Sequence, residues 1–140
     1  MLSQKTLETA IDKACIKLYR TKKHFIDEEA HERTIVSDFI APFLRARFPR
    51  WDVSTEYNRE GADRDTKKDL KGRMLMPDIV IHKHGPEGPN VLAIQVKGYW
   101  NPEDRRIDVG KLRRLRTKHG YRFLYRLELK PEMHKLTRIN

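Results

Sequence analysis

Three polar residues interrupt two of the most apolar stretches of the chain, and their types suit metal chemistry. Asp78 precedes the run Ile79–Ile81, and Gln95 and Lys97 lie at the end of a run that begins at Val91. Burying a charge or an unpaired amide costs free energy, so these residues need an explanation. A carboxylate and an amide oxygen are hard ligands for Mg²⁺. A lysine beside them can position an attacking water or stabilise charge growing on a phosphate.

Two neighbouring strands would bring these residues together. Residues 77–83 and 91–97 are short apolar segments, and "GPEGPN" between them predicts a turn. Side chains alternate along a strand, so Gln95 and Lys97 share one face. If the strands are antiparallel, Asp78 at the start of the first meets the end of the second. We therefore expect the three polar groups to converge at one edge of a sheet.

Two helices are predicted before these strands. Apolar residues at helical spacing indicate an N-terminal helix within residues 1–26 and a second helix over 27–48. Asp27 is the expected N-cap of the second helix. Pro42 should kink or break that helix, because a proline cannot donate to the carbonyl of Asp38.

The segments after the two strands predict a helix and a further strand. Residues 108–119 have apolar positions at helical spacing, with Asp108 as the expected N-cap and Gly120 as the C-terminal stop. Residues 121–130 alternate between apolar and charged side chains, as a half-buried strand does. Three segments complete the chain: a predicted strand near 51–57, a charged loop over 58–76 that we expect to be mobile, and a tail over 131–140 without a clear pattern.

Composition indicates one basic domain. The chain has 140 residues, of which 38% are hydrophobic, and carries a net charge of +10, which attracts polyanions. No apolar run is long enough for a membrane span, and the N-terminal residues do not resemble a signal peptide. The single Cys15 excludes an internal disulfide and a cysteine-based zinc cluster. A cytoplasmic protein without a membrane partner is expected.

The pattern "PD" at Pro77–Asp78 followed by "QVK" at Gln95–Lys97 resembles the PD-(D/E)xK phosphodiesterase superfamily, which has the restriction-endonuclease-like fold. The core order of that fold is αβββαβ, and the elements predicted over residues 27–130 follow it. "HERTIVSDFI" and "GYRFLYRLEL" are similar to small uncharacterised bacterial and phage proteins of this fold. The resemblance implies a single α/β domain over residues 1–140, with a mixed central sheet and an extra N-terminal helix.

The resemblance also implies roles for individual residues. Asp78 matches the metal-binding aspartate, Lys97 matches the catalytic lysine, and the Val96 carbonyl would be a further metal ligand. Many members carry a glutamate on the first core helix. Glu32 is the candidate, although an ordinary acid of a first helical turn is an equal alternative. Gln95 departs from the commoner Glu or Asp: its amide oxygen can bind a metal but brings no charge, so metal affinity should be weaker.

These residues predict a nuclease that hydrolyses DNA with Mg²⁺ or Mn²⁺. The alternatives are a non-catalytic nucleic-acid-binding module on the same fold, an RNA-directed nuclease, and a purely structural ion pair between Asp78 and Lys97. A homodimer is open, since two-strand cleavage would suggest two copies. A basic stretch and two aromatic residues are candidates for nucleic-acid contacts or for simple solvation and packing. They are Tyr99, Trp100, Arg105, Arg106, Lys111, Arg113, Arg114 and Lys118.

Overall fold

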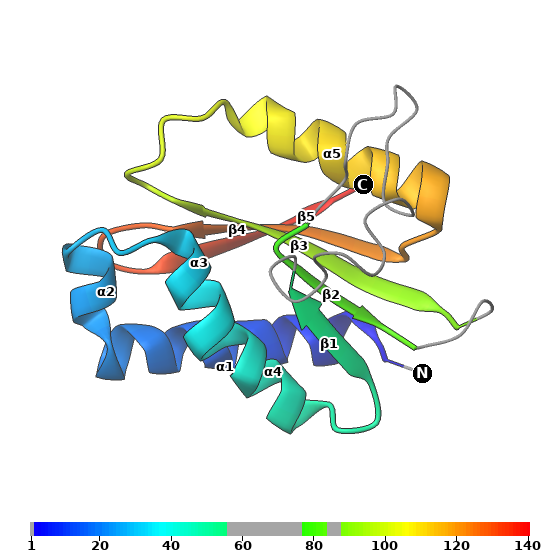
Figure 1. The fold of residues 1–140 in the computed structure, drawn as a ribbon, viewed down its shortest axis with the longest axis horizontal. Helices are drawn as coiled ribbons and strands as arrows, with labels where there is room; N and C mark the ends of the chain where they lie inside the picture. Colours follow the sequence, from blue (N-terminus) through cyan, green and yellow to red (C-terminus); the bar gives the residue numbers. More distant parts are fainter. Residues whose placement is uncertain (1, 56–76, 84–87) are drawn as a thin grey trace.

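A five-stranded mixed sheet forms the centre of the protein (Figure 1). The computed structural model describes residues 2–55, 77–83 and 88–140, so the predicted loop over 58–76 lies outside the described residues. The strands follow one another across the sheet in chain order. They are β1 (Asp52–Thr55), β2 (Ile79–His82), β3 (Asn90–Gly98), β4 (Phe123–Leu129) and β5 (His134–Ile139). Only β3 and β4 pair in parallel; the other neighbours are antiparallel.

Helices cover both faces of this sheet (Figure 1). The face toward the N-terminal half is covered by α1 (Gln4–Thr21), α3 (Glu32–Ile35), the π-helical turn η1 (Val36–Ile40) and α4 (Ala41–Arg47), with the short α2 (Lys23–Asp27) beside them. The other face is covered by α5 (Arg105–His119), which connects β3 to β4. Two apolar clusters fill the spaces between these layers. The predicted α/β protein with a mixed central sheet is therefore confirmed, and its helices and sheet form three layers.

The predicted hairpin is confirmed. β2 and β3 are antiparallel, with Ile79 opposite Ile94 and Val80 opposite Ala93. β3 is buried along almost its whole length, because it is flanked by β2 and β4 and covered on both faces. Its polar residues Gln95 and Lys97 are therefore buried too.

The start predicted for the second helix, at Asp27, is wrong. Asp27 does not cap it but ends α2, where its carboxylate pairs with Lys23 at 2.9 Å; the next helix begins at Glu32. Pro42 does not break that helix. A π-helical turn precedes it, in which the Ala41 N–H donates to the Val36 carbonyl, so the chain continues to Arg47 without the bond that proline lacks.

Two expectations for the second half of the chain are also corrected. α5 begins three residues earlier than predicted, and Asp104 rather than Asp108 caps it by accepting a hydrogen bond from the Arg106 N–H at 2.9 Å. The hydrogen bonds from Arg106 lower the pKa of Asp104 to about 2. Gly120 ends the helix with φ of 70°, as expected. The tail does form a strand, β5, at the edge of the sheet.

Among the described residues, no helix is long and apolar enough to cross a membrane.

Candidate functional site

Asp78 lies where the β2–β3 ladder ends. Asp78 comes just before Ile79, the first residue of β2, which pairs with Ile94 of β3. Gln95 comes just after Ile94. The Asp78 Oδ2 accepts a hydrogen bond of 2.6 Å from the Val96 N–H. Asp78 is buried, and its carboxylate takes the place that a backbone carbonyl would have as the acceptor of the Val96 N–H. The structure therefore brings the start of β2 and the end of β3 together, as the hairpin predicts.

Gln95 carries an acceptor that the fold does not use. The residue is 8% exposed, and its Oε1 is buried without a hydrogen-bond partner among the described residues. An unsatisfied buried carbonyl of this kind costs about 1–3 kcal/mol. Because the neighbouring Asp78 carboxylate is also an oxygen donor, the two residues together form the kind of hard donor set that Mg²⁺ prefers.

Lys97 points to the layer of α5. Its Nζ lies 3.4 Å from the Asp108 Oδ1 and 3.2 Å from the Glu103 Oε1. The Lys97 and Asp108 side chains are 5% and 0% exposed, whereas Glu103 is partly open at 42%. The purely structural alternative, an ion pair between Lys97 and Asp78, is not the pairing found among the described residues: the acids that neutralise the ammonium group come from α5 and the segment before it.

Asp108 was missed as a site residue because sequence reasoning placed it at a helix cap. It is instead fully buried in the first turn of α5. Burial raises the pKa of Asp108, and the nearby Lys97 ammonium partly offsets that rise. The sequence does contain a signal for this pair. A lysine at the end of a buried strand needs an acid, and the first turn of the following helix contains one.

The charged cluster extends onto β4. The parallel register places Gln95 beside Arg126 and Lys97 beside Glu128. Arg126 and Glu128 form an ion pair at 3.2 Å, and Arg105 of α5 lies 3.7 Å from the same glutamate. The Arg126 and Glu128 side chains are 19% and 15% exposed, so the polar face predicted for this strand is partly covered.

Glu32 reaches the end of β3 from the opposite layer. Its Oε2 accepts a hydrogen bond from the Gly98 N–H at 2.5 Å, and the Asn101 amide donates to both carboxylate oxygens at 3.1 and 3.3 Å. A hollow of about 380 Å³ lies beside Glu32 and is also lined by His31, Arg33 and Thr34. Glu32 therefore holds the backbone just beyond Lys97. No hydrogen bond or ion pair joins it to Asp78, Gln95 or Lys97 within the described ranges.

The two predicted aromatic contacts differ in exposure. Tyr99 is 39% exposed, whereas Trp100 packs against the larger apolar cluster. A Cβ atom on Gly98 would lie 2.5 Å from the Trp100 ring, so the indole covers this glycine. The two rings meet edge to face at 5.1 Å. Trp100 is thus a packing residue, whereas Tyr99 is exposed to solvent.

The predicted basic residues lie on or next to α5. Arg105 is committed to the fold through Glu128 and the carbonyls of Asn101 and Gly98, and Arg106 pairs with Asp104. Arg113 is exposed and donates to the Asn140 carbonyl. The others are exposed or partly exposed on the same helix: Lys111, Arg114 and Lys118. Arg105, Arg106 and Arg113 are therefore already engaged in contacts within the protein, which the sequence does not suggest.

Three or more His, Cys, Asp or Glu side chains do not gather into a metal-binding group anywhere in residues 2–55, 77–83 and 88–140. A cation at the strand ends would therefore rely on Asp78 together with amide and backbone oxygens. No family model, curated protein or solved structure matches the chain.

Proposed function

We propose that this protein is a Mg²⁺- or Mn²⁺-dependent phosphodiesterase that hydrolyses DNA, of the PD-(D/E)xK type. The observation that carries the proposal is the hydrogen bond from the Val96 N–H to Asp78, which joins the start of β2 to the segment of β3 that holds Gln95 and Lys97, with the Gln95 Oε1 left unsatisfied. The order of helices and strands from α3 to β4 supports the restriction-endonuclease-like fold, because it follows αβββαβ.

The residues present suit a divalent cation. Asp78, Gln95 and the Val96 carbonyl would hold it through oxygen atoms, and the buried Gln95 amide would gain the partner it lacks. A bound Mg²⁺ or Mn²⁺ would supply Lewis acidity and lower the pKa of a bound water. With one carboxylate in this set, we expect an affinity weaker than that of sites with two or three.

The protein's own residues would do the remaining work. Lys97 provides an ammonium group that can stabilise charge on a phosphate oxygen, and Asp108 and Glu103 fix its position. Glu32 holds the Gly98 N–H and Asn101, which keeps the chain beyond Lys97 in place. In this account Glu32 assists by positioning the end of β3. The exposed cations of α5 would hold the phosphate backbone.

The test is cleavage of supercoiled plasmid, single-stranded DNA and RNA with Mg²⁺, with Mn²⁺ and with chelator. Asp78→Asn is the sharpest variant, because its amide oxygen can still accept the Val96 N–H while the charge is lost. Lys5→Met, an exposed cation of α1, is the control. We expect metal-dependent DNA cleavage that Asp78→Asn abolishes and Lys5→Met leaves unchanged. Cleavage that persists in chelator or in Asp78→Asn would refute the proposal.

A non-catalytic nucleic-acid-binding module is the second candidate. It is favoured by the ion pairs that already neutralise Lys97 and by the lack of a three-acid cluster in the described part of the chain. Salt-sensitive DNA binding without cleavage in either metal would support it.

A further inference from the structure

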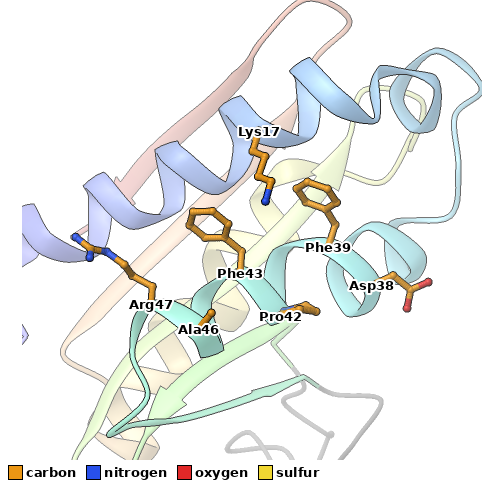
Figure 2. Close-up of a pocket in the computed structure, with 7 residues that line it drawn as sticks. All are labelled: Lys17, Asp38, Phe39, Pro42, Phe43, Ala46 and Arg47. Carbon is orange, nitrogen blue, oxygen red and sulfur yellow. The ribbon is translucent and has the colours of Figure 1, made fainter.

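A hollow on the outer side of the N-terminal layer plays no part in the proposed reaction. It lies between α1 and the helix formed by η1 and α4, and has a volume of about 540 Å³ (Figure 2). A second hollow of about 450 Å³ adjoins it, because Lys17 and Phe43 line both. Together they form an outer groove along the two helices, which we call the α1–α4 groove.

The floor of the α1–α4 groove is apolar. Phe39 and Phe43 are four residues apart, so both point to α1 from the same side of their helix (Figure 2). Pro42 and Ala46 add exposed apolar surface beside them. On α1, Ile16 is 42% exposed and lines the adjoining hollow. Large apolar side chains left open together in a groove indicate a binding surface.

The rim of the groove is positively charged. Four exposed cations line the two hollows, against the single acid Asp38, so the local charge is four minus one, or +3. They are Lys13, Lys17, Arg20 and Arg47. Within the described part of the chain none of these cations forms an ion pair, although the Lys17 Nζ lies 6.0 Å from the centre of the Phe43 ring. The rim therefore offers unneutralised positive charge on both sides of an apolar floor.

We propose that the α1–α4 groove binds an acidic amphipathic helix of a partner protein. Such a helix presents apolar anchors every three or four residues, which suit the apolar floor, and flanking acids, which suit the cationic rim. Two other occupants fit less well. A second copy of this chain, with its net charge of +10, would bring a like charge to the rim. A nucleic acid would need free ring faces for base stacking, and the Lys17 ammonium lies over Phe43.

The test uses a labelled synthetic helical peptide of about 18 residues, or five turns, with Leu toward the groove and Glu on both flanks. A second peptide has Lys in place of each Glu. Fluorescence anisotropy measures the affinity of each peptide for the full chain. The main variant is Lys13→Glu with Lys17→Glu. Its control is Lys130→Glu with Lys135→Glu, which changes the net charge equally at exposed positions outside the groove.

We expect the acidic peptide to bind the wild type and to lose at least about tenfold in affinity on reversal of the two groove lysines, while the control reversal has a smaller effect. The reversed groove should bind the Lys peptide instead. Ile16→Ser should also weaken binding, and because Ile16 is exposed this variant should fold. Plasmid cleavage should not change in any of these variants, which separates this test from that of the proposed function.

Four results would overturn the proposal. The first is an acidic peptide that does not bind, and the second is equal loss of binding in the groove and control reversals. The third is a single-stranded oligonucleotide whose affinity falls more on groove reversal than on control reversal, since nucleic acid would then be the occupant. The fourth is self-association in sedimentation that the groove reversal abolishes, which would assign the groove to a second copy.

Discussion

Replacing Lys97 with Met should destabilise the fold, by an amount that follows from its buried ion pair. The Lys97 Nζ lies 3.4 Å from the Asp108 Oδ1, and the two side chains are 5% and 0% exposed. At an effective dielectric constant of about 20, two unit charges at this separation attract by about 5 kcal/mol. Removing one partner of a buried pair costs about 3–5 kcal/mol, since the other charge is left without compensation. We expect a loss of free energy of unfolding at the lower end of this range, about 3 kcal/mol near pH 8. The loss is limited because Asp108 can take up a proton and become neutral.

The loss should depend on pH. Burial raises the pKa of Asp108, whereas the Lys97 charge lowers it. Removal of the Lys97 charge should therefore raise the pKa of Asp108 further. A carboxyl whose pKa is higher in the folded protein than in the unfolded chain binds its proton more tightly when folded. Its contribution to stability is full below the unfolded pKa of about 3.9 and is lost as the pH rises through the folded pKa. The Lys97→Met variant should therefore be less impaired at pH 5 than at pH 8.

Urea unfolding, followed by tryptophan fluorescence at both pH values, measures these differences. A loss of about 3 kcal/mol corresponds to a midpoint lower by roughly 1.5 M for a typical small domain. Lys23→Met is the matched control, because its ion pair with Asp27 is exposed to solvent and should contribute little to stability. Changing Lys97 to Met and Asp108 to Leu together should recover most of the stability. A small loss at both pH values, or a double variant as unstable as the sum of its parts, would refute the reasoning.

Three further predictions concern the site and the core. Gln95→Glu adds a carboxylate beside Asp78, so Mn²⁺ should bind about tenfold more tightly by calorimetry; unchanged affinity would place the cation elsewhere. Gly98→Ala would put a methyl group 2.5 Å from the Trp100 ring, so the free energy of unfolding should fall by about 1–3 kcal/mol in urea; an unchanged midpoint would show that the indole can move away. Cys15 is fully buried and burial raises the pKa of its thiol, so it should react with a thiol reagent only after unfolding, and rapid reaction of the native protein would contradict that burial.

The parts of the fold that could be predicted are those that local sequence dictates. Alternation and the Gly/Pro turn predict the β2–β3 hairpin, and the helical spacing of buried residues such as Leu7 and Ile11 predicts α1. Gly120 marks the end of α5 because the residue that closes this helix has a left-handed backbone conformation, which glycine adopts without strain. Each of these features depends on residues close in sequence.

The parts that could not be predicted depend on distant contacts. Asp108 looks like a helix cap by sequence, and only the crossover through α5 places it on Lys97. Asp27 also has the type of an N-cap, yet its pairing with Lys23 and the new helix start at Glu32 decide otherwise. The last strand, β5, was missed because its apolar residues do not alternate regularly; it forms by pairing with β4.

The candidate site divides in the same way. The juxtaposition of Asp78 with Gln95 follows from the hairpin register, so the sequence alone was sufficient for it. The acceptor roles of Asp78 and Glu32 toward the backbone of Val96 and Gly98 could not be foreseen, because they depend on how the strand ends and the first core helix pack.

The most direct test of the central claim is a calorimetric titration of the metal-free protein with Mn²⁺, for the wild type and for Asp78→Asn. Binding should occur at one site per chain and be lost in the variant, because Asp78 is the only carboxylate proposed to hold the cation directly. The Lys5→Met control should bind as the wild type does. If Asp78→Asn binds Mn²⁺ as tightly as the wild type, the ends of β2 and β3 are not a metal site, and the account of a metal-dependent phosphodiesterase is contradicted.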